Sequence, residues 1–523
     1  MEGLGIKVRC LASTRISRCD QGEERVGKGG DDDQSESVLD GTNEESLDSE
    51  SAVEPSTRSE HVESEDDDNE PEPQSSSSTR SFSSDPESDA DEKNDSAREE
   101  ASLKCIRHIS CVQEAQLSPD GSCIFTSDYN RNFSVYPIAN DILSEADTRA
   151  LGPYTSFKSP NPIWAFAVNP LFNLQDPSST TVLLSRRDSY ISLHNALWDT
   201  TTVFPSSDTQ PSSTAPVNIS TPLASYKLVN NLTEAVTAPL SLSFSSDSAH
   251  FFAGAQDKIA IFDIQERDAP IHTISTIPAK RNKLKGGGRG FKGHISALSL
   301  SPPTISSTDG LIAAGSWTRY VGIYDAVSGA EVTHFPLPGT ISSSSTFGKM
   351  PRNENLEHVM GSGVSSLRWS PCGRYLYVAE RSSDVLLIYD VRKFAYSLAH
   401  CAGRKARTKQ KLGFDIWNAG QSPYDIEGTS HEVWAGGTDG RIRVWRDPYV
   451  KEGAVEPDEV VQIHGGDEIP VVGTLVHTSG SLAVAARGIV EIGDDIKTQG
   501  QRRGGGLRPK IREWGSLDIL GLG

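Results

Sequence analysis

Short apolar stretches alternate with polar turns along most of the chain after Leu103. In stretches such as residues 314–325 (AGSWTRYVGIYD), apolar and polar side chains alternate with a period of two residues. This period is typical of β-strands, in which successive side chains point to opposite faces of a sheet. Long stretches with helical periodicity are missing. The pattern therefore predicts an all-β region built from many short strands.

Two kinds of segment recur in a fixed order, which indicates an internal repeat. The first is an apolar strand that runs into a Ser-Pro or Asp-Gly turn, and it occurs at 115–121, 165–170, 241–248, 297–302, 366–373 and 474–480. The second is a small-residue strand, a polar turn and an alternating strand, and it occurs at 126–137, 184–195, 253–263, 314–325, 379–390, 435–447 and, weakly, 510–515. The ring residues that close this second segment are Tyr136, His194, Phe262, Tyr324, Tyr389, Trp445 and Trp514.

The repeat count predicts the architecture. Each unit supplies about four strands, and such a sheet cannot cover both of its faces alone, so the sheets must stack around an axis. The closing ring residues lie 56 to 69 positions apart, which is more than the about 40–45 residues of a compact WD40 repeat. We therefore predict a seven-bladed WD40 β-propeller over residues 103–523, with long loops at about 200–235, 265–293 and 335–362 and an irregular C-terminal blade.

A closed propeller also needs a strand that joins its two ends. We expect a strand near Cys105–Ser110 to complete the last blade beside Lys510–Trp514, because the repeat begins just after the first of these segments.

Almost all of the net charge belongs to the N-terminal segment. Residues 1–100 contain 30 acidic and 10 basic residues, a net charge of −20 out of −21 for the whole chain. They are rich in Ser, Asp and Glu, with few aromatic residues, and such a segment cannot bury enough apolar surface to offset the entropy of ordering. We predict that residues 1–102 form a disordered acidic tail, which either only solvates the chain or binds basic proteins such as histones.

Several classes of site are not indicated by the sequence. The seven cysteines are dispersed without a Cys-x-x-Cys pair, which favours reduced thiols in the nucleus or cytosol. No apolar run approaches the roughly 18 residues of a membrane helix. The histidines lack metal-binding spacing, no G-x-S-x-G occurs, and the glycine-rich stretch lacks the Lys-Ser/Thr of a P-loop. We therefore predict no catalytic residue, metal, cofactor, small-molecule substrate or membrane contact.

Basic residues are concentrated in irregular stretches of an otherwise neutral region. Basic side chains neutralise phosphates, and an aromatic ring beside them can stack on an exposed base. The stretch 279–294 supplies the RNA-binding candidates Lys280, Arg281, Lys283, Lys285, Arg289, Phe291 and Lys292. A second run, 403–411, supplies Arg404, Lys405 and Arg407 together with Lys409 and Lys411, and a third run covers 501–510. Each run could instead be a solvated loop, a partner of the acidic tail or a nuclear localisation signal.

Several blades together resemble one WD40 family. The segments are SLSFSSDSAHFFAGAQDKIAIFDI, AAGSWTRYVGIYDAVSGAE, YVAERSSDVLLIYDVRKF, LGFDIWNAG and VWAGGTDGRIRVWRD. They are similar to blades of the telomerase Cajal body protein family, WD40 proteins that escort small Cajal body RNAs, and of its fungal spliceosome-associated relatives. The resemblance covers roughly residues 103–490.

The resemblance implies a non-catalytic nuclear scaffold. Its expected partners are small nuclear or Cajal body-type RNA and ribonucleoprotein proteins, and the propeller is expected to be monomeric. The implied location is the nucleoplasm or Cajal body, and a cytoplasmic pool is compatible with it. The basic stretch 279–293, a Ser/Thr/Pro-rich insert at 205–222 and the terminus after Gly488 depart from the animal pattern. Telomerase is therefore only one of the RNPs that it could serve, beside spliceosomal snRNPs.

A second resemblance concerns one strand end. Tyr389-Asp390-Val391-Arg392 is similar to the W-D-x-R box by which WD40 adaptors dock on cullin-4 ubiquitin ligases, with Tyr in place of Trp. It makes Asp390 and Arg392 candidates for adaptor docking. The alternative is an ordinary ion pair at the blade edge.

Overall fold

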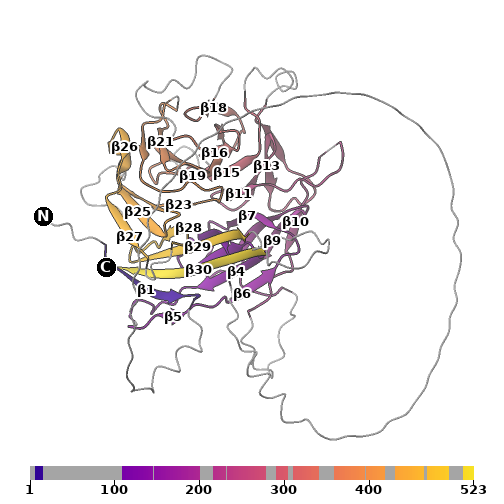
Figure 1. The fold of residues 1–523 in the computed structure, drawn as a ribbon. Coiled ribbons are helices and arrows are strands. Elements are labelled where there is room, and N and C mark those ends of the chain that lie inside the picture. Colours follow the sequence, from indigo (N-terminus) through magenta and orange to yellow (C-terminus); the bar gives the residue numbers. More distant parts are fainter. Residues whose placement is uncertain are drawn as a thin grey trace, which may run out of the picture. The chain divides into compact units, whose positions relative to one another are not determined.

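The alternating segments form strands that pair into seven sheets arranged in a ring (Figure 1). The computed structural model describes residues 6–15, 109–144, 146–200, 216–230, 232–277, 290–303, 310–340, 359–394, 396–418, 430–463, 468–493 and 510–523. Each sheet is one blade, and within a blade consecutive strands pair antiparallel from the axis outward. The predicted all-β, seven-bladed propeller is confirmed.

Blades 1 to 4 each contain four strands, named here from the axis outward. Blade 1 consists of β2 (Val112–Leu117), β3 (Cys123–Asp128), β4 (Asn132–Pro137) and β6 (Thr155–Lys158). Blade 2 consists of β7 (Ile163–Val168), β8 (Thr181–Arg186), β9 (Ile191–Asn195) and β10 (Ala224–Tyr226). Blade 3 consists of β11 (Ser241–Phe244), β12 (His250–Ala255), β13 (Lys258–Asp263) and β14 (His272–Ser275). Blade 4 consists of β15 (Ile295–Leu300), β16 (Leu311–Ser316), β17 (Tyr320–Asp325) and β18 (Glu331–Pro336).

Blades 5 and 7 carry a fifth strand that comes from a neighbouring blade. Blade 5 consists of β19 (Val364–Trp369), β20 (Tyr375–Glu380), β21 (Leu386–Asp390), β22 (Ala399–Cys401) and β26 (Gly453–Val455). Blade 6 consists of β23 (Phe414–Trp417), β24 (Glu432–Gly436), β25 (Arg441–Arg446) and β27 (Glu459–Gln462), with a short 3-10 helix at Pro448–Val450. Blade 7 consists of β28 (Val471–Val476), β29 (Leu482–Gly493), β30 (Lys510–Leu522), β1 (Val8–Ser13) and β5 (Arg149–Ala150).

The core lies between the blades. Seven clusters of buried apolar residues each combine side chains from two consecutive blades, and the seventh joins blade 7 to blade 1. Tyr136, Tyr324 and Trp445, three of the predicted ring residues, are almost completely buried there. A blade's two apolar faces are covered only by its neighbours, so the ring has to close for the core to be complete.

The ring closes through β1, not through the segment near Cys105–Ser110. β1 pairs antiparallel with the end of β30, from Val8 opposite Leu522 to Ser13 opposite Asp518. Of the expected closing segment, the structure describes only residues 109 and 110, and these lie outside any strand. Residues 8–13 therefore belong to the propeller, which corrects both the closing strand and the expected boundary at residue 103.

The predicted closing ring residue of the seventh repeat, Trp514, is wrong. Trp514 was expected to be the ring residue of blade 7, but it lies on β30 with 43% of its surface exposed. Leu520, only 1% exposed, occupies the position that Tyr324 and Trp445 fill in their blades, because Ala483 pairs with it as Ile312 pairs with Tyr324. β29 and β30 continue by six residue pairs beyond the length of the other blades. The repeat pattern matched this extension, so the ring residue was assigned to Trp514.

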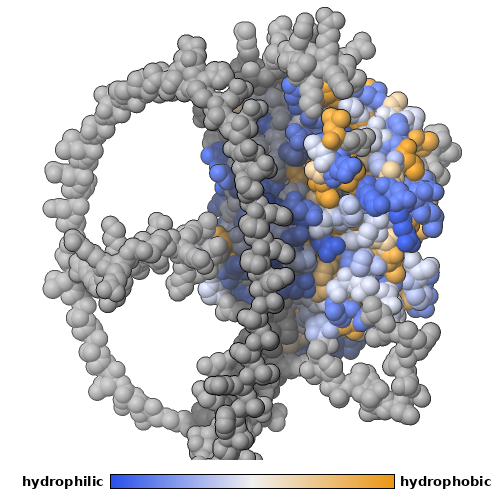
Figure 2. Space-filling model, turned by 90° about the vertical axis from the view of Figure 1, so that its right-hand side faces the viewer, coloured by the Kyte–Doolittle hydropathy of each residue, from blue (hydrophilic) through white to orange (hydrophobic). Residues whose placement is uncertain are grey.

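Two of the predicted long loops contain the outer strand of their blade. β10 and β14 lie within the ranges assigned to loops, and they are short or largely water-exposed, which weakens their alternating pattern. β18 precedes the third loop and only its end enters that range. Two blade edges are extended further by parallel pairing with a neighbour: β26 pairs with β22, and β5 pairs with β1. The outer side in Figure 2, where β10 and β13 lie in Figure 1, is largely hydrophilic with scattered apolar residues.

Candidate functional site

One end of the propeller carries a pocket of about 800 Å³ on its axis. At this end the second strand of each blade turns into the third, and the fourth strand connects to the next blade. We call it the pocket face. Strands or turns of six blades contribute to the lining, from Val112 in blade 1 to Val472 in blade 7, and the segment that leads into blade 6 contributes Lys409, Gln410 and Lys411. A site that draws on blades 7 and 1 together exists only when the ring is closed.

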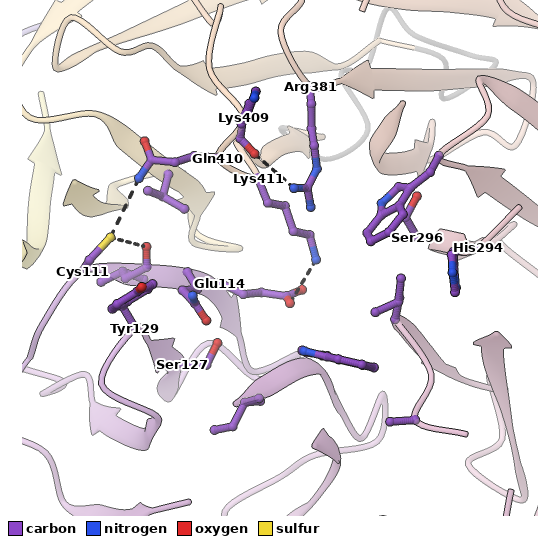
Figure 3. A pocket seen from close by; sticks show the side chains of 18 of the residues that line it. Cys111, Glu114, Ser127, Tyr129, His294, Ser296, Arg381, Lys409, Gln410 and Lys411 are labelled. Carbon is purple, nitrogen blue, oxygen red and sulfur yellow. Dashed lines mark hydrogen bonds and ion pairs between the residues drawn. The ribbon is translucent and has the colours of Figure 1, made fainter. Parts of the chain in front are cut away.

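Charged groups line one side of the pocket (Figure 3). Lys411 extends toward Glu114, with 3.0 Å between its Nζ and the carboxylate, and Arg381 points into the same space. Arg381 donates a hydrogen bond from Nη1 to the backbone oxygen of Lys409, at 3.0 Å. Burial lowers the pKa of the Arg381 guanidinium, but this group stays charged at neutral pH. Lys409 itself is exposed at the rim.

Aromatic side chains line the remaining walls. Tyr129, Trp164 and Trp317 line the pocket and are each about two-fifths exposed. The ring of His294 lies 5.2 Å from that of Trp317, and the Arg381 guanidinium carbon lies 6.0 Å from the same indole. Large exposed aromatic rings beside cations form a surface that suits flat, anionic ligands such as nucleotides.

The first basic stretch joins the pocket face, but most of its candidates lie outside the described residues. This applies to Lys280, Arg281, Lys283, Lys285 and Arg289. The chain leaves the described part at Ile277, after β14, and returns at Gly290, before β15. Gly293 donates its N–H to Asp257 at 2.7 Å, and Lys292 is exposed beside this turn.

Phe291 does not have the exposed position that was expected of it. Its side chain is 3% exposed and belongs to the core between blades 3 and 4. Its ring stacks on Tyr320, with 5.9 Å between centroids and 2° between planes. The Phe291 ring is enclosed by protein side chains, so the expectation that it stacks on an RNA base is corrected. Phe291 instead anchors the end of the basic stretch in the core.

The second basic run is divided between core and surface. Arg404 is completely buried, and its guanidinium donates hydrogen bonds to the backbone oxygens of Gly436, Leu412 and Gly413 at 2.7–3.1 Å. Burial lowers the pKa of Arg404 to about 10. It stabilises the connection between blades 5 and 6 and cannot contact RNA, which corrects that expectation.

Two further candidates of this run are exposed but already opposed by acids. Lys405 lies 3.7 Å from Asp439, and Arg407 lies 2.8 Å from Asp384. Both side chains are more than half exposed, so they remain accessible to a phosphate. The third run, 501–510, connects β29 to β30 at the pocket face, and its residues 501–509 lie outside the described part.

Comparison with known proteins identifies several that are similar to this chain. No family model matches the sequence. The chain is 24% identical to guanine nucleotide-binding protein negative regulator 1 of Schizosaccharomyces pombe, over 65% of this chain and 71% of that protein. It is 24% and 23% identical to telomerase Cajal body protein 1 of Bos taurus and Homo sapiens, over 63% of this chain in each case. Together with the seven-bladed ring, these similarities support a WD40 family of this kind.

The similarity covers only part of the telomerase Cajal body proteins. The WD40 propeller spans about half the length of the telomerase Cajal body proteins it matches, 49% in Bos taurus and 48% in Homo sapiens. It also matches protein SWT21 of Vanderwaltozyma polyspora, with 21% identity over 55% of this chain and 58% of that protein.

The adaptor-docking candidates of the WD40 propeller lie at the end opposite the pocket face. Asp390 ends β21, and the Arg392 Nε donates to its carboxylate at 2.9 Å, which holds the pKa of Asp390 below its usual range. The Arg392 side chain is 78% exposed. The Asp390–Arg392 ion pair that was considered as the alternative is therefore present. The Arg392 side chain is also accessible to a partner protein.

Among the residues that the structure describes, no group of three or more His, Cys, Asp or Glu side chains could hold a metal ion. Within the same ranges, no helix has the length and apolar character needed to cross a membrane.

Sequence reasoning missed most of the pocket-lining groups as a site. Trp164 and Trp317 were not among the binding candidates taken from the sequence. Tyr129, Trp317 and Arg381 share one register position, the residue just after the second strand of their blades. That position is the signal that could have identified them, since it always faces this end of the propeller.

Proposed function

We propose that this protein is a non-catalytic nuclear WD40 scaffold that binds small nuclear or Cajal body-type RNA together with ribonucleoprotein proteins. The observation that supports it most is the convergence on the pocket face. The aromatic rings of Trp164 and Trp317, the cations Arg381 and Lys409 and the attachment points of all three basic runs occur at this one end. The names of the telomerase Cajal body relatives support a nuclear RNP setting.

The division of labour follows from the rigidity of the blades. Strands fix where each turn and connection begins, and these irregular segments supply the cations and rings. Phosphate contacts position the RNA, whereas stacking and base contacts select it. The basic residues Lys280, Arg281, Lys283 and Lys285 are proposed to supply phosphate contacts, and Lys405 and Arg407 to add to them.

The test is crosslinking of the purified full-length protein to cellular RNA, followed by affinity measurements across salt concentrations. Replacement of Lys280, Arg281, Lys283 and Lys285 by Gln is expected to weaken binding about 100-fold near physiological salt. It should lower the slope of log affinity against log salt by about 3, because four phosphate contacts are lost.

The matched control removes four exposed cations from the opposite end, by changing Lys7, Arg392, Lys393 and Lys451 to Gln. This variant should bind RNA as the wild type does. Equal losses in the two variants would mean that only net charge matters. Recovery of no small nuclear RNA above a control made of residues 1–100 alone would refute the proposal.

The alternative is a protein-only adaptor, and the exposed Arg392 beside Asp390 is the observation that keeps it open. Under our proposal, Arg392→Ala leaves RNA affinity unchanged, because this residue lies at the far end of blade 5. The adaptor alternative instead predicts salt-insensitive capture of a cullin-4 ligase complex that Arg392→Ala abolishes. Affinity purification of both forms at low and high salt separates the two. Binding of histones through the acidic segment would disappear when residues 27–100 are deleted.

A further inference from the structure

Trp317 has an exposed ring in a turn that does not require one. It is 43% exposed, although it lines the pocket. The same position holds Arg187 in blade 2, Gln256 in blade 3 and Gly437 in blade 6, and the equivalent pairing position of blade 7, inside β29, holds Gly488. Polar side chains and glycine therefore satisfy the fold at this position, and the large ring of Trp317 needs another explanation.

The indole is nevertheless held in place. The backbone N–H of Trp317 donates to the His294 backbone oxygen at 3.1 Å, and the His294 ring packs against the indole. The next residue, Thr318, donates its hydroxyl to the backbone oxygen of Lys292. Gly363 lies so close that a Cβ there would be 2.8 Å from the Trp317 backbone oxygen. A ring fixed in advance loses little side-chain entropy when a ligand stacks on it.

Basic side chains lie close to the Trp317 ring. Arg381 is the link, because its guanidinium carbon is 6.0 Å from the Trp317 ring and its Nη1 is hydrogen-bonded to the backbone of Lys409. Lys411 extends from the same segment into the pocket, where Glu114 partly balances its charge. Lys409 is exposed, and no side-chain ion pair is formed by it within the ranges that the structure describes.

We propose that Trp317 is a stacking site for one unpaired base of the bound RNA, and that Arg381 and Lys409 contact the phosphates beside that base. This inference rests on the proposed function and specifies where single-stranded RNA is held. An unpaired base is favoured over a base pair because a stacked pair in a duplex has no free face to offer the ring. A peptide is the less favoured occupant, since the three Arg and Lys side chains of the lining outnumber its two carboxylates, Glu114 and Asp188.

The test uses the full chain and a single-stranded RNA of mixed sequence, about 12 nucleotides long, with 2-aminopurine at one position. Trp317→Ala is expected to weaken binding about 5- to 100-fold and to abolish quenching of the 2-aminopurine, because one stacking contact is lost. Trp317→Phe should restore most of both signals. Trp198→Ala is the matched control, because Trp198 is also exposed, 52%, but follows the third strand of blade 2 at the opposite end.

The outcomes separate this inference from the proposed function. If the wild type binds RNA and Trp317→Ala matches Trp198→Ala in affinity and quenching, the stacking site is wrong and the scaffold function stands. If the wild type binds neither this RNA nor cellular small nuclear RNA, the proposed function itself fails. If Trp317→Ala loses a protein partner but keeps RNA affinity, the pocket takes a peptide and the inference is overturned. Thermal melting of each variant verifies that the fold is retained.

Discussion

Deleting residues 1–15 is expected to lower the free energy of unfolding by at least about 4 kcal/mol, because it removes β1 from the last blade. Leu11 and Ala12 are buried in the core that joins blades 7 and 1. Ser13 donates a hydrogen bond to Asp518 at 2.5 Å, and Asp518 lies 3.6 Å from the buried Arg487. Without β1, the outer edge of β30 loses its strand partner and Asp518 loses the hydrogen bond from Ser13. Urea unfolding followed by circular dichroism measures the loss.

A substitution within β1 shows whether the loss of stability comes from the missing strand contacts or only from shortening the chain. Leu11→Asp should destabilise nearly as strongly as the deletion, because it places a charge in the core. Arg9→Asp on the exposed side of the same strand should have little effect. Adding a peptide of residues 1–21 in trans should restore part of the stability of the truncated protein. Equal stability of the truncated and full-length chains would show that another segment closes the ring.

Replacing Arg319 by Met is expected to destabilise the propeller by about 3–5 kcal/mol, because it leaves a buried carboxylate without its partner. The Arg319 Nε lies 2.9 Å from Glu380, and both side chains are largely buried between blades 4 and 5. Arg319 also donates to the Pro338 backbone oxygen at 2.7 Å, and Gly361 donates to Glu380 at 2.8 Å. Denaturant titration of the wild type and the variant gives the difference in stability.

A second substitution and a pH series test the stated cause. Changing both partners, Arg319→Met with Glu380→Leu, should recover most of the loss, because no buried charge remains. Burial raises the pKa of Glu380 above its usual range. The folded variant therefore gains a proton as the pH falls, and its deficit relative to the wild type should narrow toward acid pH. A deficit that is independent of pH would point to lost packing instead.

The same ion pair connects stability to the proposed site. Arg319 lies in the turn that presents Trp317, with a positive φ of 65°. A left-handed conformation at a non-glycine residue costs roughly 1–2 kcal/mol, which the contacts with Glu380 and Pro338 offset. Loss of the Arg319–Glu380 pair is therefore expected to increase the mobility of the Trp317 turn even under conditions in which the blade stays folded.

Local sequence was sufficient for much of the blade architecture. The turn and strand at Asp439-Gly440 and Trp445 have the predicted form, with Gly440 at a positive φ of 69° and Trp445 buried. Such features depend on contacts between neighbouring residues of one hairpin, so a period of two and a turn signal define them. The blade count followed from the repetition of this hairpin.

Sequence could not distinguish residues whose role depends on distant partners. Arg404 and Lys405 are adjacent members of one basic run, yet backbone oxygens from blade 6 and the segment leading into it surround the first, while the second is exposed. Phe291 sits among glycine and basic residues, but it packs against Tyr320. In each case the deciding partner is separated in sequence, and no local pattern reports its position.

The sequence alone thus determined the strands, their grouping into seven blades and the acidic charge of the first hundred residues, because these depend on local periodicity and composition. Only the tertiary structure showed that β1 closes the ring beside β30, a pairing between residues about 500 positions apart. Stacking of blades 4 and 5 and of the segment that leads into blade 6 brings Trp317, Arg381 and Lys409 to one pocket, and ring closure adds Glu114 of blade 1 to the same lining. Ring closure brings residues from the two ends of the chain into contact around the propeller axis. Local sequence patterns report only contacts between neighbouring residues, so they cannot reveal it.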